Sequence, residues 1–65
     1  MLISVNGERR ELDAETLDAA LNALGYGGRK IATAVNGCFV AATQRERTKL
    51  SDGDQVEVVA PMQGG

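Results

Sequence analysis

Two Asn-Gly pairs constrain the fold of this 65-residue chain more than any other feature. Asn6-Gly7 and Asn36-Gly37 each separate two short runs in which apolar residues alternate with others, and Asn-Gly is the strongest short signal for a two-residue hairpin turn. The run that returns from the first turn is mostly charged, as is typical of an exposed edge strand. The strands of the two predicted hairpins cover residues 1–5, 8–12, 31–35 and 38–40.

One helix is predicted between the two hairpins, from about residue 17 to residue 24. Its apolar residues recur at i, i+3, i+4 and i+7, which places them on one face that packs on the sheet: Leu17, Ala20, Leu21 and Leu24. Thr16 or Asp13 is expected to cap the start of the helix by accepting a bond from a free backbone N–H group. Gly25 stands where a left-handed C-terminal cap is needed.

The last part of the chain contributes one more strand. Residues 42–49 are polar and lack periodicity, so we expect a surface loop with at most one turn of helix. After a turn, a final strand is indicated by alternating inward-facing residues: Val56, Val58 and Ala60. Pro61 ends this strand, because proline has no N–H group to give to a sheet.

The resulting order is strand, strand, helix, strand, strand, strand. The β-grasp arrangement of the α+β class, also called ubiquitin-like, satisfies this order with a mixed four- to five-stranded sheet packed on one main helix. In this arrangement the first and last strands, which are the most apolar, pair in parallel at the centre of the sheet. We therefore expect a β-grasp domain over residues 1–60 and a flexible tail over residues 61–65.

The chain has few reactive groups. It has no His, no Trp and one Cys, so it can build neither a disulfide nor a Cys/His metal site, and it lacks the side chain best suited to proton transfer near neutral pH. A two-layer domain of this size also has little left over to enclose a ligand pocket of roughly 300–1,000 Å³. We therefore expect no enzyme activity and no bound cofactor.

Charge and hydropathy argue against two further classes of protein. The net charge is −2, and one Phe and one Tyr are too few for base stacking, so nucleic-acid binding is not expected. No apolar run approaches the ~20 residues needed to span a bilayer, so membrane insertion is not expected. The lone Cys and the lack of a basic, apolar leader favour a cytoplasmic protein, and we expect a monomer when the protein is free.

The last five residues carry neither charge nor a periodic pattern. Fully extended, they reach about 17 Å beyond the domain. Because Gly64 and Gly65 have no side chains, this end fits a narrow channel and its acyl carbon is open to attack. Taken alone, a frayed terminus or a linker cut at a domain boundary explains the two glycines equally well.

Several short motifs occur in a characteristic order. They are Ile3-x-Val5-Asn6-Gly7, the Thr16-capped helix, Ala32-x-Ala34-Val35-Asn36-Gly37, Leu50-x-Asp52-Gly53-Asp54-x-Val56-Glu57-Val58 and Gln63-Gly64-Gly65. In this order the chain resembles the ThiS family of sulfur carriers over essentially its whole length, and more distantly MoaD and ubiquitin. MoaD-like carriers tend to be longer and to lack the early Val-Asn-Gly turn. Ala41-Ala42 departs from the Pro-Arg of many family members, so no partner contact is assigned there.

This resemblance implies a protein cosubstrate whose reactive group is the C-terminal carboxylate of Gly65. An ionised carboxylate is a poor acyl electrophile, and in the family a ThiF-like adenylyltransferase activates it with MgATP. Sulfur from a cysteine desulfurase or another donor then gives a thiocarboxylate. A ThiG-like thiazole synthase takes this sulfur into the thiazole ring of the thiamin precursor. Gln63 and Gly64 are expected to thread the tail into these enzymes.

Four further features of the sequence are candidates for a role. Val59 and Met62 are candidate docking residues, because both lie near the tail and present apolar surface; the interface is expected to be small, about 1,200 Å² or below. The charged run Arg45–Lys49 is more often a solvated loop than a partner contact. Cys38 follows a turn and is explained more simply as a small side chain at a strand start than as a sulfur relay.

Two alternatives share the predicted fold. One is a ubiquitin-like modifier, or a sulfur carrier for another pathway such as molybdopterin, tRNA thiolation or cysteine synthesis. The other is a β-grasp interaction module with an inert tail. The sequence alone does not separate these alternatives from a carrier for thiazole formation.

Overall fold

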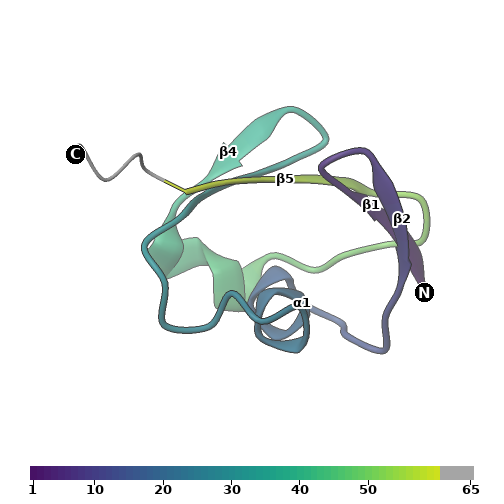
Figure 1. Ribbon diagram of the computed structural model, residues 1–65, viewed down its shortest axis with the longest axis horizontal. Helices are drawn as coiled ribbons and strands as arrows, with labels where there is room; N and C mark the ends of the chain where they lie inside the picture. Colours follow the sequence, from purple (N-terminus) through teal and green to yellow (C-terminus); the bar gives the residue numbers. More distant parts are fainter. Residues whose placement is uncertain (61–65) are drawn as a thin grey trace.

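The computed structural model describes residues 1–60, and its central feature is a five-stranded mixed sheet with two helices on one face (Figure 1). The elements are β1 (Leu2–Val5), β2 (Glu8–Glu11), α1 (Leu17–Ala23), β3 (Ala32–Val35), β4 (Cys38–Val40), the 3₁₀ helix η1 (Ala42–Arg47) and β5 (Gln55–Val59). The strand order is β2-β1-β5-β3-β4, in which β1 and β5 are parallel and the other pairs antiparallel. The predicted pairing of the first and last strands is confirmed. The predicted tail, residues 61–65, lies outside the described residues.

Both Asn-Gly pairs form the predicted hairpin turns. The φ angles are 52° and 84° at Asn6 and Gly7, and 51° and 83° at Asn36 and Gly37. Positive φ at both central positions is the mark of a type I′ turn, whose twist matches that of the strands it joins. The charged strand β2 forms one edge of the sheet and all four of its residues are exposed, as predicted.

Helix α1 begins and ends as its sequence predicts to within one residue. The hydroxyl oxygen of Thr16 accepts a bond from the backbone N–H of the third helical residue at 3.2 Å. The helix ends at Ala23, one residue early, and Gly25 follows with a φ of 90°. The N–H of Tyr26 donates to the carbonyl of Leu21 at 2.9 Å, which completes a Schellman-type cap. No helix within residues 1–60 has the length and apolar character needed to cross a bilayer.

The core lies between α1 and the face of the sheet that α1 covers. Ile3 and Leu17 are its most completely buried large side chains. The buried apolar residues are Ile3, Val5, Ala14, Leu17, Ala20, Leu21, Val40, Leu50, Val56 and Val58. Thr33 is the one polar residue buried with them in the described part of the chain, and its hydroxyl donates to the carbonyl of Val40 at 2.9 Å. The inward alternation predicted for the first and last strands holds at Ile3, Val5, Val56 and Val58. The prediction that Ala60 continues it is wrong, because β5 ends at Val59 and Ala60 is exposed.

The segment after β4 is more ordered than predicted, because η1 spans six residues where at most one turn of helix was expected. The guanidinium of Arg45 reaches from η1 to β3: Nε donates to the hydroxyl of Thr33 at 3.1 Å, and a terminal nitrogen donates to the carbonyl of Ile31 at 2.6 Å. Arg45 is half-buried. The prediction that it belongs to a solvated charged loop is wrong, because its partners lie 12 and 14 residues away and no local pattern reveals them.

Candidate functional site at the end of β5

The candidate site begins where β5 ends, since this strand leads to the tail. β5 is the middle strand of the sheet, with β1 on one side and β3 on the other. β1 pairs only with the start of β5, where Ser4 lies opposite Gln55. β3 pairs with β5 as far as Val59. The last part of β5 therefore extends past the end of β1 and is held mainly from one side.

Most of the predicted site residues lie outside the described part of the chain. These are Gly65, Gly64, Gln63 and Met62. Val59 is described, and 63% of its surface is exposed on the face of the sheet opposite α1. The alternation in β5 predicted this outward orientation, and the docking role of Val59 stays a prediction.

Val59 belongs to an exposed apolar surface that was not predicted from the sequence. Directly paired residues of neighbouring strands point to the same face of a sheet, and Val59 pairs with Ala32, while Ala34 pairs with Phe39. We call these four residues the outer patch. Phe39 is 72% exposed, and Glu57, which pairs with Ala34, adds a carboxylate at the margin of the patch.

The sequence did contain a signal for this patch. Within β4 the alternation places Val40 in the core, so its neighbour Phe39 has to face outward. A large aromatic side chain at a solvent-facing position is unusual enough to mark a contact surface.

Cys38 occupies the first position of β4 and is exposed. It pairs with Val35 of β3, at the edge of the sheet next to the second Asn-Gly turn. This position agrees with a structural role at a strand start. Within residues 1–60, no group of three or more potential metal ligands lies close enough together to hold an ion.

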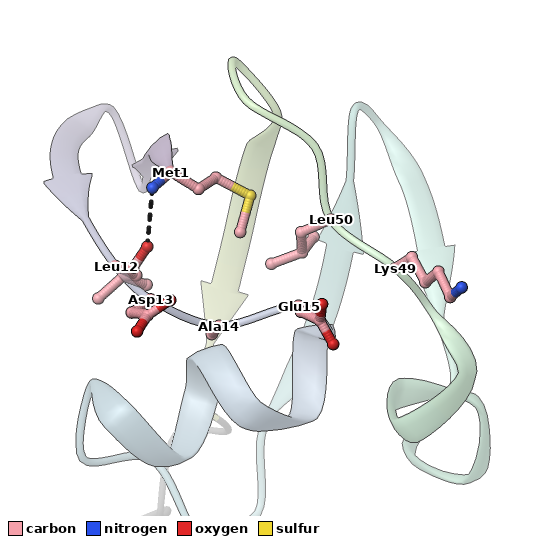
Figure 2. A pocket seen from close by; sticks show the side chains of 7 residues that line it. All are labelled: Met1, Leu12, Asp13, Ala14, Glu15, Lys49 and Leu50. Carbon is pink, nitrogen blue, oxygen red and sulfur yellow. Dashed lines mark hydrogen bonds between the residues drawn. The ribbon is translucent and has the colours of Figure 1, made fainter.

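A pocket of about 320 Å³ lies at the other end of the molecule, between the start of β1, the segment before α1 and the segment after η1 (Figure 2). Its lining residues are Met1, Leu12, Asp13, Ala14, Glu15, Lys49 and Leu50. The amine of Met1 donates to the carbonyl of Leu12 at 3.0 Å, whereas the Lys49 ammonium points away from the pocket (Figure 2). Because β1 and β5 are parallel, Met1 is about seven strand positions, or roughly 23 Å, from Val59. The pocket is therefore not part of the site at the base of the tail.

A solved structure shares this fold. The thiamine biosynthesis protein ThiS from Geobacter metallireducens, known from a crystal structure, superposes with a TM-score of 0.83 and 30% sequence identity, and the match covers the whole of both chains. The fold and the site therefore define a ubiquitin-like protein of the β-grasp class, as the order of elements predicted.

Comparison of sequences gives the family. The model of the ThiS family matches residues 3–65. The sulfur carrier protein ThiS of Thermus thermophilus is 38% identical over 64 residues, which are 98% of this chain and all of that protein. The chain belongs to the ThiS family, and its predicted assignment to the sulfur carriers of thiamin biosynthesis is confirmed.

One relative is much longer. The thiazole synthase of Paramagnetospirillum magneticum is 36% identical over 66 residues, which cover this whole chain but only 20% of that protein. This chain thus spans one fifth of the length of that relative. A segment similar to this chain thus occurs within a longer polypeptide named thiazole synthase.

Proposed function

We propose that this chain carries sulfur as a thiocarboxylate on the C-terminal carboxyl group of Gly65 and delivers it for formation of the thiazole ring of thiamin. The observation that carries the proposal is that the match to the ThiS family runs through residue 65 and so includes both final glycines. The chain acts as a protein cosubstrate and not as an enzyme. Its own contribution is to present Gly65, with Gly64 and Gln63 occupying the narrow approach to a partner's active site.

The chemistry proceeds on partner enzymes. A ThiF-like adenylyltransferase uses MgATP: a carboxylate oxygen of Gly65 attacks the α-phosphorus and pyrophosphate leaves, which gives an acyl-adenylate. The terminal sulfur of a persulfide, formed by a cysteine desulfurase or another donor, then attacks the acyl carbon and displaces AMP. A thiol that cleaves the resulting sulfur–sulfur bond leaves Gly65 as a thiocarboxylate and takes the other sulfur into a disulfide.

We infer that a ThiG-like thiazole synthase receives the sulfur. The relative from Paramagnetospirillum magneticum supports this inference, because a domain similar to this chain is covalently joined to a thiazole synthase there. Joining two partners in one chain raises their effective concentration without requiring a strong interface. A carrier that serves more than one enzyme has to bind each of them and leave again, so a small contact of about 1,200 Å² or less is expected.

The outer patch is the surface proposed for these contacts. It contains Val59, one of the two docking residues predicted from the sequence, and Phe39 extends it across β3 to the edge strand. Met62, the other predicted docking residue, follows three positions after Val59 in the sequence. An enzyme that takes Gly65 into its active site has to lie within about 17 Å of the end of the domain. Val59, in the outer patch, is the last residue of β5 and so lies at this end.

The proposal is tested by the intact mass of the chain. The wild-type chain is incubated with MgATP, the ThiF-like adenylyltransferase of the same organism, a cysteine desulfurase and cysteine. The expected mass gain is that of one oxygen-to-sulfur exchange, located at Gly65 by fragmentation. A variant that lacks Gly65 is the control and should show no gain. An unchanged mass of the wild-type chain under these conditions would rule out the proposal.

A second assay separates thiazole formation from the alternatives. The thiocarboxylate form is mixed with a ThiG-like thiazole synthase and its other substrates, and thiazole product is measured. Product confirms the proposed pathway. A thiocarboxylate that forms but yields no thiazole points to another sulfur pathway, and attachment of the chain to lysines of other proteins points to a ubiquitin-like modifier. A cytoplasmic location stays a prediction.

A further inference from the structure

The end of β5 lacks a neighbouring strand on the β1 side, and the side chain of Asn6 takes the place of one. The backbone N–H of Asn6 donates to the carbonyl of Val56 at 2.9 Å. Beyond this point its side-chain nitrogen donates to the carbonyl of Val58 at 3.1 Å, and its side-chain oxygen accepts from the N–H of Val58 at 2.8 Å. The amide thus pairs with β5 as one further strand residue would.

Only a side chain with both a donor and an acceptor can make this pair of bonds. The N–H and C=O of a strand residue point to the same side, so β3, on the other side of β5, offers no replacement for Asn6 at Val58. Val58 itself is anchored in the core with 7% of its surface exposed. It lies two residues before the end of the described part of the chain, and seven residues before Gly65.

The second Asn-Gly turn provides an internal comparison. The side-chain oxygen of Asn36 accepts from the N–H of Gln55 at 2.9 Å, and its nitrogen donates to a carboxylate oxygen of Asp54 at 3.0 Å. Asn36 therefore holds the beginning of β5, and Asn6 holds its end. Both residues have nearly the same backbone conformation in the same type of turn, but only Asn6 acts on the residues next to the tail.

We propose that Asn6 is a positioning residue for the tail: by fixing both backbone groups of Val58, its side chain sets the point at which the chain leaves the sheet on its way to Gly65. This inference rests on the proposed function. When the amide is removed, the end of β5 loses its hold on the β1 side, and a partner enzyme has to order it on binding. That ordering lowers the affinity for the carrier and leaves the chemistry at the bound carboxylate unchanged.

The test compares Asn6→Gly with Asn36→Gly. Glycine accepts a positive φ at either position, so each variant keeps its turn and loses only the side-chain bonds. ATP–pyrophosphate exchange with the ThiF-like adenylyltransferase gives kcat and KM for the carrier, and amide hydrogen exchange reports on Val58. For Asn6→Gly we expect faster exchange at Val58 and a KM raised about tenfold at constant kcat, the cost of ordering roughly one more residue. Asn36→Gly should leave both quantities close to those of the wild type.

A third variant separates the two bonds. Asn6→Asp keeps the acceptor for the N–H of Val58 but sets a carboxylate oxygen against its carbonyl in place of the donor, so its KM should also exceed that of the wild type. Amide exchange in the rest of the sheet shows whether each variant is folded. Equal KM values for Asn6→Gly and Asn36→Gly, or unchanged exchange at Val58 in Asn6→Gly, would overturn the proposal. Wild-type chain that supports no pyrophosphate exchange refutes the proposed function instead, and hydrogen exchange still decides whether Asn6 holds Val58.

Discussion

Replacing Arg45 with alanine tests whether the contact between η1 and β3 stabilises the fold. The Arg45 guanidinium donates to the carbonyl of Ile31 at 2.6 Å and to the hydroxyl of Thr33 at 3.1 Å. Thr33 keeps its bond to Val40 in the variant, so no buried hydroxyl loses its last partner. The variant therefore loses the stability from two hydrogen bonds donated by a charged group. It does not also leave a buried hydroxyl without a partner.

The size of the effect follows from burial. A hydrogen bond to a charged group contributes about 1.5–3 kcal/mol, and two such bonds set an upper limit near 6 kcal/mol. Arg45 and Ile31 are only half-buried, so water replaces much of what is lost. We expect Arg45→Ala to lower the free energy of unfolding by about 2 kcal/mol, out of roughly 3–10 kcal/mol for a chain of this length. This corresponds to a fall in Tm of about 8–16 °C.

Urea unfolding followed by circular dichroism measures this difference. Arg47→Ala is the matched control, because Arg47 lies in the same helix with the same charge and is exposed. Arg45→Met retains most of the aliphatic stem and separates packing from hydrogen bonding. Free energies of unfolding that agree within about 0.5 kcal/mol between the Arg45→Ala and Arg47→Ala variants would refute the reasoning. Full stability in Arg45→Met would assign the effect to packing instead.

Four further substitutions test other parts of the molecule. Leu17→Ala empties a site that is 0% exposed and should cost about 2–5 kcal/mol in urea unfolding, enough to leave much of the chain unfolded at 37 °C. Thr16→Ala removes the helix cap and should cost about 1 kcal/mol by the same measurement; no change would mean that water replaces the bond. Phe39→Ala should change stability by no more than about 0.5 kcal/mol but raise the carrier KM of the adenylyltransferase, while Leu2→Ala, exposed on the same face away from the tail, should leave KM unchanged. Cys38→Ser should retain full sulfur transfer in the mass assay, and loss of transfer would revive the sulfur-relay hypothesis.

The parts of the fold that the sequence predicted are those encoded by neighbouring residues. Each Asn-Gly turn is specified by the two residues that form it, and the helix cap at Thr16 by a hydroxyl three residues from its partner. The parallel pairing of β1 with β5 was also predictable, because only one common arrangement accommodates this order of elements and places the two most apolar strands in the middle.

The parts that the sequence did not predict depend on contacts between distant residues. The partners of Arg45 are fixed by where η1 lies against β3, and the amide of Asn6 meets Val58 across a separation of 52 residues. In a sequence, Asn6 is fully explained as a turn residue, so nothing suggests that its side chain has a second task. The outer patch is an intermediate case, because alternation gives the orientation of Phe39 but only the strand order brings it beside β5.

The strand order also places the two proposed tasks of a carrier on different strands. The tail follows the central strand β5, and the docking residue Phe39 lies on the edge strand β4. The first part of β5, the strand that leads to the tail, is paired with β1 and β3, so it opens only when much of the sheet opens. β4, which holds Phe39, is an edge strand of three residues and pairs only with β3. Hydrogen exchange should therefore be slower in the middle of β5 than in β4. In the proposed function, Phe39 on the short edge strand can adjust to two different enzymes in turn, whereas the end of β5 presents Gly65 in the same way to both.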